Sequence, residues 1–133
     1  MKFEDKYFSK LTFTKEQIKK FLLNAKNDFD IAREDKFLQV KFNYCYQALI
    51  KAGIALISSY NIKVRSVVGH HVKIIQVMSD IIKDKTIDVI GNMMRSKRNT
   101  DMYGGGVEIT EKEIDEYIKF VGKIIEKIEI KLK

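Results

Sequence analysis

The chain has 133 residues, of which 45% are hydrophobic and 32% are charged, and its formal charge is +7. This composition excludes a disordered chain and suits a single domain over residues 1–133 with one core. No apolar run approaches the roughly 18 residues of a membrane span, and the first residues do not resemble a secretion signal. We therefore expect a cytoplasmic protein that does not enter a membrane.

The first predicted helix follows a short N-terminal segment, residues 1–13, which is either a docking helix or an extended arm. Thr14 and Gln17 have the spacing of a capping box, and apolar residues then recur with a helical period. A second helix is expected over about residues 35–60. Its polar residues are confined to a narrow wedge, so we expect it to be the most buried helix.

Three more helices are expected after a break at residues 61–65. Ser66 is predicted to cap the third and Thr86 the fourth, which runs to about Met102. Thr110 and Glu113 form a second capping box before the fifth helix. Proline is absent, which favours long uninterrupted helices. The sequence thus predicts an all-α fold, an up-down bundle of five helices without a β-sheet.

The fourth helix has a fixed charge on its apolar face. Ile87, Ile90 and Met94 recur at i, i+3 and i+7, and Arg98 is the next member of this stripe. A guanidinium on a core-facing line needs a partner, water or an anion, because burying an unpaired charge is costly. Arg98 either marks a binding site, or it caps its own helix or pairs with Asp101 at i+3.

Other kinds of site are poorly supported. A metal site needs several convergent ligands, whereas this chain has two adjacent histidines and one cysteine, so we expect neither a metal nor a cofactor. His71 borders an apolar stripe, where a satisfied, half-buried histidine is more common than a catalytic one. What remains is a cluster of cationic and polar residues in the last turns of the fourth helix: Arg95, Lys97, Arg98, Asn99, Asp101 and Tyr103.

At these residues the chain resembles the HEPN superfamily of helical bundles. The resemblance covers roughly residues 18–130. It rests on the aromatic- and alanine-rich segment 44–52, the link at 60–65, and Arg98-Asn99-x-x-x-Tyr103 near the end of the fourth helix. Many HEPN proteins carry an arginine followed by a histidine, often as RNxxxH. In this chain Tyr103 occupies the histidine position.

The resemblance implies a homodimer that engages RNA or a nucleotide. It assigns Arg98, Tyr103 and Asn99 to catalysis, and we add Arg95, Lys97 and Asp101 as substrate-binding residues. In the family, the RNA 2′-hydroxyl attacks the neighbouring phosphate without a metal, while the arginine stabilises the phosphate charge. Tyrosine titrates near 10 and histidine near 6.5, so Tyr103 is a weaker base at pH 7. The protein is accordingly either a metal-independent endoribonuclease of toxin or defence type or a weakened relative.

Two other hypotheses fit the same sequence. The protein is alternatively a noncatalytic interaction module that partners a separately encoded small nucleotidyltransferase, as in a toxin-antitoxin pair. In that case Arg98 and Tyr103 organise a protein interface. The third hypothesis is a structural bundle in which Arg98 only pairs with Asp101.

Overall fold

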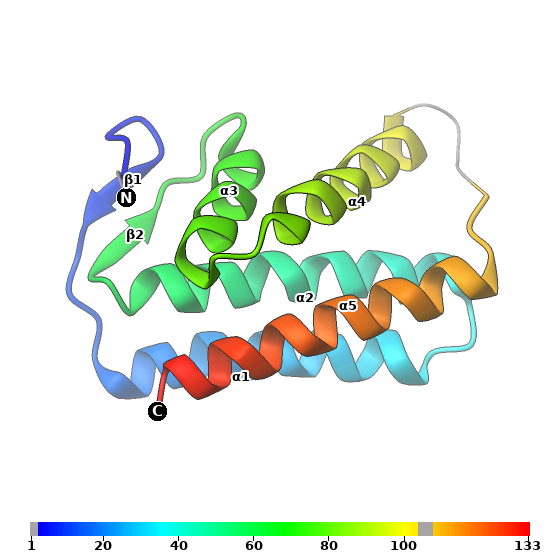
Figure 1. Cartoon of the computed structure of the whole chain (residues 1–133), viewed down its shortest axis with the longest axis horizontal. Coiled ribbons are helices and arrows are strands. Elements are labelled where there is room, and N and C mark those ends of the chain that lie inside the picture. Colours follow the sequence, from blue (N-terminus) through cyan, green and yellow to red (C-terminus); the bar gives the residue numbers. More distant parts are fainter. Residues whose placement is uncertain (1–2, 104–107) are drawn as a thin grey trace.

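The computed structural model describes residues 3–103 and 108–133, apart from the side chains of residues 101–103 (Figure 1). This part of the chain is built mainly of helices, which confirms an all-α bundle. None of the helices described here combines the length and apolar character needed to cross a membrane. The helices are α1 (Lys15–Glu34), α2 (Leu38–Ser58), α3 (His70–Ile82), α4 (Lys85–Tyr103) and α5 (Glu111–Lys131).

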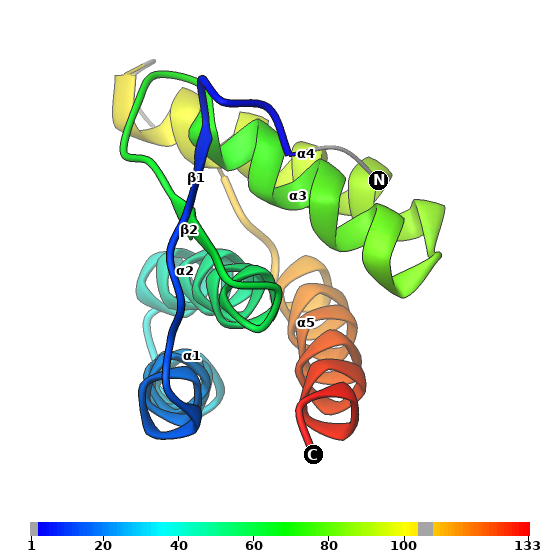
Figure 2. The ribbon, with the colours of Figure 1, turned by 90° about the vertical axis from the view of Figure 1, so that its left-hand side faces the viewer.

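The helices are arranged with α2 at the centre. Figure 2 shows α1 and α5 on one side of α2, and α3 and α4 on the other. α2 contacts all four of the other helices, which agrees with its expected burial. Its alanines at positions 48, 52 and 55 have no exposed surface, and such small side chains allow neighbouring helices to approach closely.

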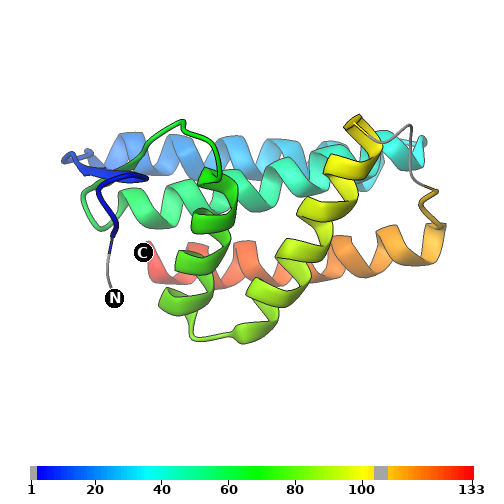
Figure 3. The same cartoon turned by 90° about the horizontal axis from the view of Figure 1, so that it is seen from above.

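α3 and α4 do not alternate up and down with the other helices. In Figure 3 they form a pair that runs across the direction of α1, α2 and α5. Glycines allow this close crossing: a Cβ at Gly53 of α2 would lie 2.5 Å from Cγ2 of Ile74 on α3. A Cβ at Gly91 of α4 would lie 2.8 Å from Cγ2 of Ile75 on α3, so this glycine allows α3 and α4 to lie close together. Helical periodicity predicts which residues share a face, but it does not predict the angle at which two helices cross.

The capping boxes at Thr14 and Thr110 are confirmed, whereas the two other predicted caps are wrong. α3 begins at His70, because the chain first turns at Gly69, whose φ of 85° favours glycine. Ser66 therefore lies outside the helix. At the start of α4 the carboxylate of Asp84 accepts hydrogen bonds from the backbone N–H and the hydroxyl of Thr86, at 3.0 and 2.6 Å.

The prediction that there is no β-sheet is also wrong. β1 (Phe8–Lys10) pairs antiparallel with β2 (Ile62–Val64), with Phe8 opposite Val64. The side chain of Phe8 is buried, and Arg65 Nη1 donates to the carbonyl of Asp5 at 2.8 Å. The segment 1–13 is thus an extended arm over its described residues. It pairs with the link after α2 because both segments need backbone hydrogen-bond partners.

Candidate functional site around Arg98

Arg98 packs against an aromatic ring of the central helix. Ile87 and Met94 on the same stripe of α4 are fully buried, whereas Arg98 is half-buried. Its guanidinium carbon lies 5.6 Å from the centroid of the Tyr46 ring on α2. The ring face attracts the cation, so it provides the partner that this stripe position requires. The alternative pairing with Asp101 lies outside the described side chains.

Tyr46 in turn connects α2 to α3. Its hydroxyl is hydrogen-bonded to Nδ1 of His71 at 2.9 Å, and the two ring centroids are 5.7 Å apart. Burial raises the pKa of Tyr46 to about 12, although the nearby charges of Arg98 and Arg95 oppose this rise. The phenol therefore keeps its proton at pH 7, and it holds both the guanidinium and the imidazole in place.

His71 is neutral at pH 7. Burial lowers its pKa to about 4, and electrostatic interactions with the neighbouring His70 and with the guanidinium groups of Arg98 and Arg95 act in the same direction. The ring of His70 packs against it with centroids 4.4 Å apart, and Nδ1 of His70 donates to the carbonyl of Val67 at 2.7 Å. The site thus combines an uncharged imidazole with two fixed cations. The imidazole can accept or donate a proton, and the two guanidinium groups can bind a phosphate.

Arg95 belongs to this site, whereas Lys97 does not. The charge of Arg95 acts on both Tyr46 and His71, and its Nε donates to Oδ1 of Asn92 at 3.1 Å. Lys97 faces α5 instead. It forms an ion pair with Glu113 and lies over another aromatic ring, with Nζ 5.9 Å from the centroid of Tyr117. Two residues apart on a helix, Arg95 and Lys97 point in very different directions, which explains the difference.

The remaining predicted site residues are only partly placed. Asn99 is half-buried on α4. The backbone of α4 extends to Tyr103, as the sequence predicted, but the side chains of Asp101 and Tyr103 lie outside the described residues. Among the described residues no group of three or more histidine, cysteine or acidic side chains is arranged to hold a metal. Burial raises the pKa of the Cys45 thiol to about 12, which leaves it unreactive.

The sequence did not identify Tyr46 and His71 as members of the site. They lie 25 residues apart on different helices and are 52 and 27 residues from Arg98, so no local spacing connects the three. The expectation that His71 is half-buried and satisfied is confirmed by its bond to Tyr46. In the sequence Tyr46 is an aromatic residue in an alanine-rich helix, and His71 is a histidine beside an apolar stripe. Both patterns are typical of residues that only pack in the core, so neither residue indicated a functional site.

No protein-family model matches the chain, and neither the curated proteins nor the solved structures contain a match. The resemblance to HEPN proteins stays a prediction that rests on the residues quoted above.

Proposed function

We propose that the protein is a HEPN-type RNA-engaging protein that cleaves RNA without a metal, with Arg98 and Arg95 binding the phosphate and His71 moving the proton. The observation that carries the proposal is that one aromatic ring, Tyr46, holds both the guanidinium of Arg98 and the imidazole of His71. The family pattern needs an arginine and a histidine together. In this chain α3 supplies the histidine that position 103 lacks.

The proposed reaction is an internal transfer within the RNA. A ring nitrogen of His71 accepts the proton of the 2′-hydroxyl, and the 2′ oxygen forms a bond to phosphorus. The bond from phosphorus to the 5′ oxygen breaks, and that oxygen takes a proton from solvent, which leaves a 2′,3′-cyclic phosphate and a 5′-hydroxyl. Arg98 and Arg95 stabilise the negative charge that builds up on the phosphate.

The low pKa of His71 fits this role only when substrate is bound. With a pKa of about 4 the imidazole is uncharged and ready at pH 7, but it is a weak base. A bound phosphate would offset the positive charges of the two arginines, which are among the causes of the low pKa. The pKa of His71 should therefore rise as RNA binds, so that the histidine becomes a stronger base in the complex.

The test is degradation of mixed RNA in EDTA, with binding measured separately. Arg98→Ala should abolish cleavage and weaken RNA binding, whereas His71→Asn should abolish cleavage and spare binding. Lys85→Gln is the matched control, since Lys85 is an exposed lysine at the start of α4, at the opposite end of the helix from Arg98. It should cleave and bind RNA as the wild type does, with circular dichroism showing that all variants are folded.

Changes at Tyr103 separate this mechanism from the family pattern. Tyr103→His restores the arginine and histidine pair of the motif and should raise cleavage. Tyr103→Phe should reduce cleavage only modestly if His71 moves the proton. Loss of cleavage in Tyr103→Phe together with full activity in His71→Asn would contradict our assignment of His71. If no variant cleaves and Arg98→Ala binds RNA and nucleotides normally, the interaction module that partners a nucleotidyltransferase is the better hypothesis.

The proposal includes a homodimer formed through α4. Val89 and Met93 lie one turn apart on this helix with 60% and 55% of their surfaces exposed. They line a groove of about 630 Å³ that also contains Lys97 and Tyr117. Exposed apolar side chains along a groove are typical of protein interfaces. A second copy bound there would bring two Arg98 helices together, as the family resemblance implies.

A further inference from the structure

A second cavity lies at the other end of the molecule from the last turn of α4. Its volume is about 710 Å³, and it opens where α1 begins and where α2 and α5 end. Figures 1 and 3 both place this end of the bundle opposite the C-terminal end of α4. The volume lies within the usual range for small-molecule sites, roughly 300–1,000 Å³. The Arg98 site and this cavity share no residue.

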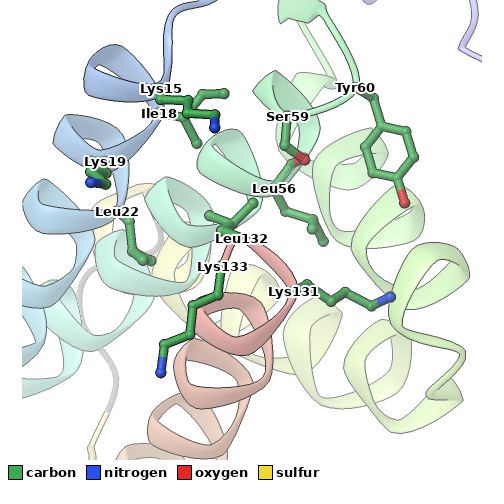
Figure 4. Close-up of a pocket in the computed structure, with 10 residues that line it drawn as sticks. All are labelled: Lys15, Ile18, Lys19, Leu22, Leu56, Ser59, Tyr60, Lys131, Leu132 and Lys133. Atoms are coloured by element: carbon green, nitrogen blue, oxygen red, sulfur yellow. The ribbon is translucent and has the colours of Figure 1, made fainter.

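The floor of the cavity is apolar. Figure 4 shows Leu22 from α1, Leu56 from α2 and Leu132 from the end of α5 lying between the three helices. Leu22 is 8% exposed and Leu56 is 1% exposed, so they belong to the core, and Ile18 extends the apolar surface outward. A floor of this kind favours a hydrocarbon group.

The rim of the cavity is cationic. Its ten lining residues include four lysines and no acidic side chain. Within the described part of the chain none of these lysines forms an ion pair, although the charge of Lys133 helps to lower the pKa of Glu129 outside the cavity. Tyr60 and Ser59 add two hydroxyl groups. The four lysines are Lys15, Lys19, Lys131 and Lys133.

We propose that this cavity binds a small amphipathic anion, an unbranched alkyl chain that ends in a carboxylate or a phosphate. The chain would lie on Leu22, Leu56 and Leu132, and the charged end would lie among the lysines of the rim. The apolar floor disfavours a fully charged ligand, such as a nucleotide, and the lysines disfavour a cationic one. A neutral alcohol would contact the apolar floor, but it would not pair with the lysines of the rim.

The first experiment compares ligands by calorimetric titration of the intact chain. Decanoate and decyl phosphate should both bind, and decanol should bind at least about fivefold more weakly because it lacks the charge. Inorganic phosphate alone should not bind at this cavity. Octanoate should bind about fifteenfold more weakly than decanoate, because it lacks two CH₂ groups and each contributes about 0.8 kcal/mol, or about fourfold in affinity. Equal affinities for decanoate and decanol would overturn the proposal.

The second experiment compares two sets of lysines. The double variant Lys15→Gln with Lys19→Gln should lower the affinity for decanoate by about fivefold and leave the affinity for decanol unchanged. Lys20→Gln is the matched control, because Lys20 is an exposed lysine of the same helix that does not line the cavity. Ile18→Gln should lower the affinity for both decanoate and decanol. If decanoate does not bind, or if it binds the double variant as well as it binds Lys20→Gln, the cavity is not the site we propose.

Discussion

The hydroxyl of Tyr46 and Nδ1 of His71 are 2.9 Å apart, and this hydrogen bond joins α2 to α3. No local sequence signal in either helix predicts the contact. The same ring packs beneath Arg98, so a single phenol joins α2, α3 and α4. A buried polar group costs free energy unless it is hydrogen-bonded, and here each of the two groups satisfies the other. The arrangement therefore stabilises the fold and positions the candidate site at the same time.

Removing the Tyr46 hydroxyl should destabilise the protein modestly. Tyr46→Phe keeps the ring beneath Arg98 but leaves Nδ1 of His71 without its partner, so we expect a loss of about 1 kcal/mol in the free energy of unfolding. Tyr46→Leu also removes the ring and should cost about 2–4 kcal/mol. Urea denaturation followed by circular dichroism measures both. Tyr60→Phe is the control: Tyr60 is 45% exposed, and its loss of a hydroxyl should change stability by less than about 0.5 kcal/mol.

Stability should fall as the pH falls from about 6.5 to about 4. The pKa of His71 is about 4 in the folded protein and about 6.5 in an unfolded chain, so the unfolded state binds the proton first in this range. The dependence should stay below about 1.4 kcal/mol per pH unit, because solvent reaches the half-buried ring.

His71→Asn separates this effect from the titration of carboxylates. Hydrogen bonds from Lys97 and Thr86 lower the pKa values of Glu113 and Asp84, so their contributions are lost mainly at still lower pH. Thermal unfolding at pH 5.0 and pH 6.5 should show a smaller difference for His71→Asn than for the wild type. Equal differences for the two proteins would show that His71 does not titrate as we describe.

Adding a methyl group at Gly53 should disturb the packing of α3 on α2. A Cβ there would lie 2.5 Å from Ile74 and 2.9 Å from Met78, so these side chains or the helix that carries them would have to shift. We expect Gly53→Ala to cost about 1–3 kcal/mol in the free energy of unfolding, despite the better helix propensity of alanine. Chemical denaturation measures the loss. Ser96→Ala, at an exposed position of α4, should have an effect of less than about 0.5 kcal/mol.

The homodimer should depend on the apolar side chains of α4. Light scattering at micromolar concentration should give about twice the chain mass of 15.5 kDa. The double variant Val89→Glu with Met93→Glu should give a monomer, because it places like charges opposite each other across a symmetric contact. Gln76→Glu adds charge at an exposed position of α3 and should leave the dimer intact. A monomeric wild type would contradict the prediction.

The sequence by itself determined the helices and the stripe that leads to Arg98. Periodicity, two capping boxes and the absence of proline act over a few residues, so they can be recognised from the chain alone. For the same reason the sequence predicts the burial of Ile87 and Met94, and it predicts that the charge of Arg98 lies on the same stripe. The arginine could be identified as an unusual residue, but its partner could not.

Only the tertiary structure decided which side chains surround Arg98. Tyr46 and His71 reach it because glycines let α3 pack close to α2 and let α4 pack close to α3, and crossing angles depend on how whole surfaces fit together. The pairing of β1 with β2 has the same origin. Local patterns determine what each segment forms, whereas the contacts between distant segments depend on the packing of the entire chain.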